Sequence, residues 1–171
     1  MILNLYFYFY FYLLITSIFC KRDTFRPPKY LQEITYHDCT RFIPDICYAK
    51  VVKVYDGDTI TVACKYPKRG NQLYRFSVRL AGIDAPEMNA HAYIDRLKAN
   101  ISKTELYNLV FNETVKLKNI KNEKYGRLLA DVYLYDLHIN DWLLKNNYAV
   151  QYNGGRKQRI DCFLKKLYNI N

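Results

Sequence analysis

Five short segments alternate apolar and polar positions and are rich in β-branched and aromatic residues, a pattern that predicts β-strands. These segments are residues 49–55, 59–65, 73–81, 114–120 and 128–135. Asp56-Gly57 has the composition of a hairpin turn between the first two. In the third segment, Val78 and Leu80 fall on one face and Arg79 falls on the other. We therefore expect Arg79 in the middle of a strand, on the side opposite an apolar face.

Helical periodicity follows in three places. Residues 92–111 repeat apolar positions at i, i+3 and i+7. Within them, Ser102-Lys103-Thr104-Glu105 has the form of a capping box, so a helix could begin again there. A short helix is predicted from about Asp141, with Asn147 as a left-handed cap, and a last helix over residues 160–167. The element order predicts an α+β fold with a mainly β core: a five-stranded barrel with three packed helices.

The N-terminal segment differs from the rest of the chain. Residues 1–20 carry no charged side chain, and Lys21-Arg22 follow directly. Because a spanning helix needs roughly 20 apolar residues, we interpret the segment as a signal peptide or a membrane anchor, with a start-site artefact as the alternative. The protein is then expected to be membrane-anchored or secreted, and otherwise cytoplasmic. Residues 21–45 are predicted to be a linker and residues 46–171 the folded domain.

The charge balance favours an anionic partner. The 171 residues include 26 Lys and Arg against 16 Asp and Glu, which gives a net charge of +10. Nucleic acid and an anionic membrane surface are the two candidates, although a Lys-rich composition also follows from an AT-rich genome. Nothing in the sequence indicates an oligomer, and we expect a monomer.

The five cysteines point to neither a zinc site nor a disulfide scaffold. None forms a C-x-x-C pair, and their number is odd. We expect mostly free thiols, with a Cys39–Cys47 bridge as the alternative.

Two aspartates are the first candidates for chemistry. Asp58 and Asp84 each lie at the end of a predicted strand. Two carboxylates with a backbone carbonyl and water suit Ca²⁺ or Mg²⁺ and not zinc. An Asp-Gly pair alone, however, is more often only a hairpin turn.

Two arginines and a glutamate complete the set. A guanidinium grips phosphate oxygens in a bidentate manner, so Arg79 and Arg127 beside a metal indicate phosphoryl transfer. Glu87 follows Asp84 after the stiff Pro86 and suits a general base, although a solvated loop glutamate is the commoner case.

Three ordered motifs resemble those of the staphylococcal (micrococcal) nuclease family over about residues 46–160. They are Asp56-Gly57-Asp58-Thr59, Arg79-Leu80 with Asp84-Ala85-Pro86-Glu87, and Lys124-Tyr125-Gly126-Arg127. The resemblance implies an OB-fold barrel and a calcium-dependent phosphodiesterase that cleaves DNA or RNA by in-line water attack, leaving 3′-phosphate ends. The alternative is a catalytically silent module of the same fold that binds nucleic acid or peptide.

The resemblance also implies a role for each matching residue. Ca²⁺ would be bound by Asp58, Asp84 and the backbone carbonyl of Ala85. Asp56 would hold these ligands in place without contacting the metal itself. Arg79 and Arg127 would hold the scissile phosphate, and Glu87 would activate or orient the attacking water. The implied substrate-binding residues are Lys124, Tyr125 and Tyr152. Tyr148 is a further candidate for base stacking, and the ending Gly154-Gly155-Arg156-Lys157 departs from the family pattern.

Overall fold

The computed structural model describes residues 27–155, which fall into two compact units. Residues 27–40 belong to the first unit and contain two short 3-10 helices, η1 (Lys29–Gln32) and η2 (Tyr36–Asp38). The second unit begins at Arg41. Among the described helices, none is long and apolar enough to cross a membrane. The predicted signal or anchor over residues 1–20 lies outside the described residues.

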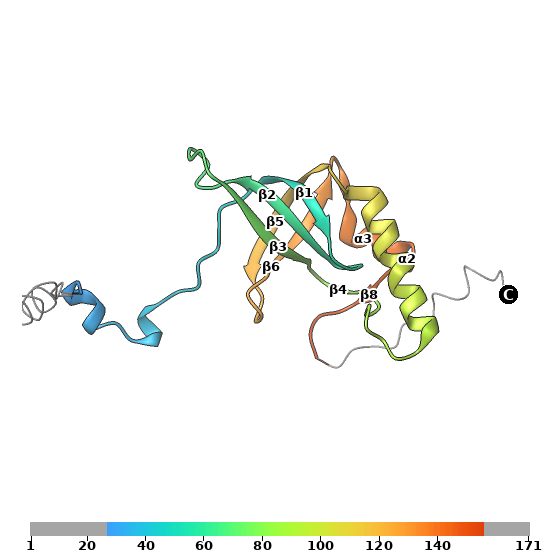
Figure 1. Ribbon diagram of the computed structural model, residues 1–171, viewed down its shortest axis with the longest axis horizontal. Helices are drawn as coiled ribbons and strands as arrows, with labels where there is room; N and C mark the ends of the chain where they lie inside the picture. Colours follow the sequence, from blue (N-terminus) through green and yellow to red (C-terminus); the bar gives the residue numbers. More distant parts are fainter. Residues whose placement is uncertain (1–26, 156–171) are drawn as a thin grey trace, which may run out of the picture. The chain divides into compact units, whose positions relative to one another are not determined.

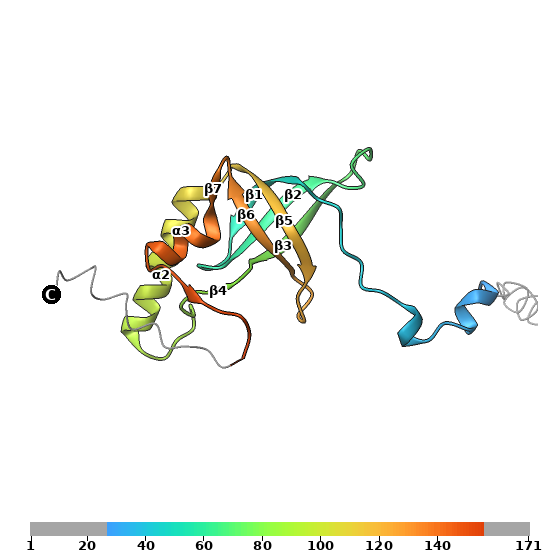
Figure 2. The same cartoon turned by 180° about the vertical axis from the view of Figure 1, so that it is seen from behind.

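The second unit is built on a closed barrel (Figures 1 and 2). Its strands are β1 (Tyr48–Val54), β2 (Thr59–Lys65), β3 (Leu73–Leu80), β4 (Ile83–Asp84), β5 (Thr114–Asn122), β6 (Leu128–Leu134), β7 (Leu137–His138) and β8 (Val150–Gln151). Antiparallel pairing runs in the order β3-β2-β1-β5-β6, and a parallel pairing of β3 with β6 closes the ring. β7 pairs with β6 as a sixth strand at the edge of this sheet. β4 and β8 form a separate two-stranded sheet. The predicted α+β fold with a five-stranded OB-type barrel is confirmed.

The core follows from the alternation within the strands. Val51, Ile60, Val62, Val78 and Leu80 have no exposed side-chain surface. Burying each such side chain contributes about 1.5–3 kcal/mol, so this interior accounts for the fixed register of the barrel.

Two α-helices pack at one end of the barrel, α2 (Tyr93–Val110) and α3 (Ile139–Lys145) (Figure 1). Asn140 fixes α3 to the barrel, because its amide accepts from the Val132 N–H at 3.0 Å and donates to the Ala81 carbonyl at 2.8 Å. The predicted third helix, residues 160–167, lies outside the described residues. Asn147 has φ +59°, as expected for a left-handed cap.

The predicted second start of a helix at Ser102 is wrong. α2 runs through this position without a break. Ser102 is fully buried, and its hydroxyl donates to the Tyr148 carbonyl at 2.7 Å instead of capping a helix. The capping-box pattern therefore reflects a tertiary contact of α2.

The described cysteines are free thiols, as expected. Cys39, Cys47 and Cys64 are free in the described part of the chain. The alternative Cys39–Cys47 bridge is therefore not formed.

Candidate active site

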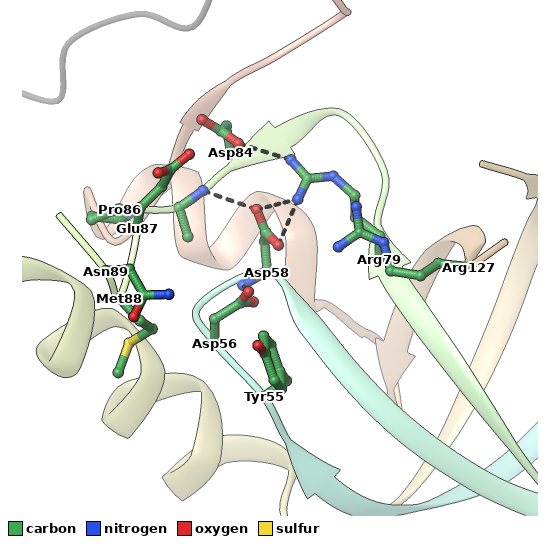
Figure 3. Close-up of a pocket in the computed structure, with 11 residues that line it drawn as sticks. Tyr55, Asp56, Asp58, Arg79, Asp84, Pro86, Glu87, Met88, Asn89 and Arg127 are labelled. Atoms are coloured by element: carbon green, nitrogen blue, oxygen red, sulfur yellow. Dashed lines mark hydrogen bonds and ion pairs between the residues drawn. The ribbon is translucent and has the colours of Figure 1, made fainter. Parts of the chain in front are cut away.

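A pocket of about 250 Å³ opens where the β1–β2 turn, the segment after β3 and the start of β6 meet (Figure 3). Its walls are Tyr55, Asp56, Asp58, Arg79, Asp84, Ala85, Pro86, Glu87, Met88, Asn89 and Arg127. All the residues predicted to bind the metal or act in catalysis therefore lie together. The parallel pairing that closes the barrel places Arg79 opposite Leu129, which brings the arginine of β3 close to Arg127.

Arg79 lies between the two aspartates (Figure 3). Its Nη1 donates to both carboxylate oxygens of Asp58 at 2.7 Å, and its Nη2 donates to Asp84 Oδ1 at 2.8 Å. Both aspartates are 3% exposed. The β4–β8 ladder fixes Asp84 by pairing it with Val150. A partly buried guanidinium that bridges two carboxylates holds all three groups in one arrangement.

The surroundings of Asp58 favour added positive charge. Burial raises the pKa of its carboxyl above the ordinary value, and the Asp56 charge raises it further. Arg79, the Ala85 N–H and the Thr59 hydroxyl act in the opposite direction without cancelling the increase. A cation beside Asp58 would offset the remaining penalty.

The donor set suits a hard divalent cation. It consists of carboxylate and carbonyl oxygens, the ligands that Ca²⁺ and Mg²⁺ prefer. Within residues 27–155 there is no group of three or more His, Cys, Asp or Glu arranged to hold a metal ion. The protein would therefore contribute Asp58, Asp84 and the Ala85 carbonyl, and water or substrate would supply the other ligands.

Arg127 is connected to the same aspartate through a residue that the sequence did not single out. Its Nη1 donates to Thr59 Oγ1 at 3.3 Å, and the Thr59 hydroxyl donates to Asp58 Oδ1 at 2.9 Å. Thr59 is 3% exposed. Its position directly after Asp58 in the first motif is the signal that could have identified it.

Glu123 is a second residue that sequence reasoning missed. Its carboxylate accepts from Arg127 Nε at 3.3 Å and from the Tyr125 N–H at 3.1 Å. Burial raises the pKa of Glu123, but these hydrogen bonds and the Arg127 charge outweigh burial and leave the pKa below its ordinary value. Glu123 therefore orients the hairpin loop that presents Arg127.

Glu87 faces the arginines across the pocket. It follows β4 after Pro86, and Figure 3 shows it on the side opposite Arg79 and Arg127. Asp56 also lines the pocket, and its Oδ1 accepts from the Asp58 N–H at 3.0 Å. The structure thus places Glu87 and Asp56 in the same pocket as Asp58 and Arg79, and their roles stay predictions.

The predicted substrate-binding residues are divided. Lys124 and Tyr152 line a neighbouring cavity of about 630 Å³, which Arg79 also lines. Tyr125 is 73% exposed and lines neither cavity. Tyr148 packs against Trp142, with ring centroids 5.5 Å apart, which places it beside the core.

Comparison with known proteins gives a family. A model described as staphylococcal nuclease homologue matches residues 77–167. An "Uncharacterized endonuclease" of Haemophilus influenzae is 38% identical over 103 residues, covering 60% of this chain and 51% of that protein. A "Probable endonuclease" of Schizosaccharomyces pombe is 33% identical over 97 residues, covering 53% and 41%. An "Uncharacterized protein" of Methanocaldococcus jannaschii is 30% identical over 149 residues, covering 72% and 69%. The chain thus spans about half the length of the first relative and less of the second.

Proposed function

The chain belongs to the staphylococcal nuclease homologue family, and on that premise we propose that its nuclease-like domain hydrolyses phosphodiester bonds of DNA, RNA or both with Ca²⁺ as cofactor. The observation that supports this most is a single pocket lined by two buried aspartates, two arginines and a glutamate. Each side-chain type suits one requirement of phosphoryl transfer.

The aspartates would hold the cofactor. Asp58 and Asp84 offer carboxylate oxygens, and Ala85 offers its backbone carbonyl. A bound Ca²⁺ would supply Lewis acidity to a phosphate oxygen. Thr59 keeps the Asp58 carboxylate in place by donating to Oδ1. The carboxylate that faces the pocket is therefore pre-oriented before substrate arrives.

The arginines would bind the phosphate group that is attacked. Arg79 is held by Asp58, Asp84 and the Ile83 carbonyl, so its side chain is already ordered. Arg127 directly precedes β6, and its side chain is ordered by Thr59 and Glu123. Two guanidinium groups fixed in this way stabilise the charge that spreads over the equatorial oxygens in the transition state.

Glu87 would accept the proton of the attacking water. The water oxygen forms a bond to phosphorus, and Glu87 takes the proton that the water loses. The bond from phosphorus to the leaving ester oxygen breaks, and that oxygen keeps the electron pair and takes a proton from solvent. Glu87 lies across the pocket from both arginines, so a phosphate held by the arginines would face Glu87.

The test is cleavage of single-stranded DNA by the full chain. We expect cleavage in Ca²⁺, none in chelator, and a loss of about 10²-fold or more in Arg127→Ala, the scale for removing one transition-state donor. Lys145→Ala removes one positive charge from α3 and should cleave as the wild type does. A folded wild-type protein that binds DNA but never cuts it would overturn the proposal and favour the catalytically silent module.

We further propose that residues 1–20 anchor the protein to a membrane or direct its secretion, on the basis of their uncharged, apolar sequence. Fractionation of cells that express the chain with and without residues 1–22 tests this. A truncated protein that stays in the membrane fraction would contradict the anchor.

A further inference from the structure

The outward face of β1, β2 and β3 is basic. These three strands contain no Asp or Glu. Exposed cations occupy four outward positions, and together they are called the basic face below: Lys50, Lys53, Lys65 and Arg75. The interior positions beside them, such as Val62 and Val78, are fully buried, so the alternation along each strand fixes the cations on the outside.

Small side chains separate the cations. Ala63 pairs with Lys50 on one side and with Arg75 on the other. In the next row, Thr61 lies between Lys53 and Ser77. Small residues with long basic side chains beside them leave room for an extended polymer to lie across these strands.

The basic face continues directly into the pocket. The same side of β3 carries Arg75 and then Arg79, and Thr59 pairs with Arg79 at the pocket end. At a rise of about 3.3 Å per residue, β3 extends about 20 Å from Arg79 to Leu73, which pairs with Lys65 of the basic face. A strand whose phosphate contacts Arg79 could therefore follow β3 from the pocket to Arg75 on the basic face.

In the part of the chain that the structure describes, the cations of the basic face have no anionic partners. None of the four forms an ion pair with a residue of the described range 27–155, whereas Lys68 pairs with Asp45 at 2.6 Å and Arg127 pairs with Glu123. Unpaired like charges in neighbouring rows repel one another, and a polyanion along them removes that repulsion and releases counterions.

Aromatic side chains border the basic face. Tyr48 and Tyr55 are 60% and 59% exposed, and Tyr55 also lines the pocket. Lys53 Nζ lies 5.7 Å from the centroid of the Tyr55 ring. Exposed rings beside a positive track are the combination with which proteins hold unpaired bases and the backbone of a single strand.

We propose that the basic face binds the sugar–phosphate backbone of a single-stranded polynucleotide next to the cleaved bond and makes the protein prefer long strands to short ones. The proposal rests on the proposed nuclease function for the position of the scissile phosphate. It assigns a ligand to the basic face that the catalytic pocket alone does not require.

Oligonucleotide binding by the full chain, measured in chelator so that no cleavage occurs, tests the role of the basic face. The probes are fluorescent oligothymidylates of increasing length, at several salt concentrations. The test variant is Lys50→Gln/Lys53→Gln/Arg75→Gln. The matched control is Lys103→Gln/Lys118→Gln/Lys145→Gln, which has the same net charge but changes α2, β5 and α3.

We expect wild-type affinity to rise with strand length and to fall steeply with salt. For single strands, each phosphate contact makes the slope of log binding constant against log salt concentration about 0.7 more negative. The test variant lacks three cations, so its slope should be about 2 units shallower than that of the wild type. The control should keep the wild-type slope and length dependence. Equal slopes in the test and control variants would overturn the proposal.

Cleavage separates this proposal from the one it rests on. The test variant should cleave a dinucleotide with wild-type kcat/KM and lose the advantage of a 20-nucleotide strand, by about tenfold or more. A wild-type protein that binds long strands but cuts nothing would refute the proposed nuclease activity and leave the role of the basic face supported.

An anionic membrane is the competing partner, and phosphatidylserine vesicles are the probe for it. If the test variant loses vesicle binding while its oligonucleotide binding is unchanged, the nucleic-acid assignment is overturned.

Discussion

Thr59→Val removes one hydroxyl from the centre of the site and leaves the shape of the side chain almost unchanged. The wild-type hydroxyl donates to Asp58 Oδ1 at 2.9 Å and accepts from Arg127 Nη1 at 3.3 Å. Both partners are charged, and Thr59 is 3% exposed, so water does not easily replace the lost bonds. The substitution therefore disconnects a proposed metal ligand from a proposed phosphate-binding arginine.

The magnitude follows from the geometry. A hydrogen bond to a charged group contributes about 1.5–3 kcal/mol, and the longer Arg127 contact contributes at the low end. We expect the free energy of unfolding to fall by about 2 kcal/mol in chelator. Partners that orient metal ligands change metal affinity by about 10–100-fold, so Ca²⁺ should bind that much more weakly to Thr59→Val.

Urea denaturation in chelator measures the stability effect, and titration calorimetry with Ca²⁺ measures the affinity. Thr59→Ser is the control, because it keeps the hydroxyl and loses only a methyl group. Equal Ca²⁺ affinities for the Val and Ser variants would refute the claim that the hydroxyl positions Asp58.

Three further predictions follow from other contacts. In Gly57→Ala, the added Cβ would overlap Ser102 Oγ and approach Ala85 Cβ to 2.8 Å. We therefore expect the free energy of unfolding to fall by about 1–3 kcal/mol and the nuclease activity to decrease. A variant with the urea midpoint and activity of the wild type would contradict this. Because the pKa of Glu123 is lowered in the folded protein, its contribution to stability is present above about pH 4.3 and is lost as the pH falls through the lowered value. Stability between pH 6 and pH 3 should therefore fall more steeply in the wild type than in Glu123→Gln, and parallel curves from urea melts would count against it. Ca²⁺ at 100 times its Kd should stabilise the wild type by about 2.7 kcal/mol, and Asp84→Asn should abolish the accompanying rise in Tm.

The strands and the main site residues were predictable because their signals are local. Alternation along residues 73–81 placed Arg79 on the opposite face from Val78, and the structure has this arrangement. Asp58 and Asp84 each lie next to a strand end, where the sequence motif alone marks them. The two-residue strands β4, β7 and β8 were not predicted, because so few residues carry no periodicity.

Contacts between distant segments were not predictable from such patterns. Thr59 bonds to Arg127, which lies 68 positions further along the chain, only because β3 and β6 close the barrel. Ser102 illustrates the same limit in a helix. Its hydroxyl has the composition of a cap but bonds to the Tyr148 carbonyl, 46 positions away, and packs against Gly57. The sequence around Ser102 therefore matches a capping box, but the contact with Tyr148 determines what the hydroxyl does in the structure.

The charge distribution gives the pocket and the basic face complementary roles. The acidic and basic residues that line the pocket are Asp56, Asp58, Asp84, Glu87, Arg79 and Arg127. Four carboxylates against two guanidinium groups leave the pocket at −2 when all are ionised, which is the charge that one divalent cation neutralises. A polynucleotide would be repelled from this pocket on its own, whereas the four cations of the basic face, which form no ion pair within residues 27–155, would attract it. On the two proposals above, the polyanion would be attracted to the outside of β1–β3, and the cofactor would be attracted to the site between β2 and β4.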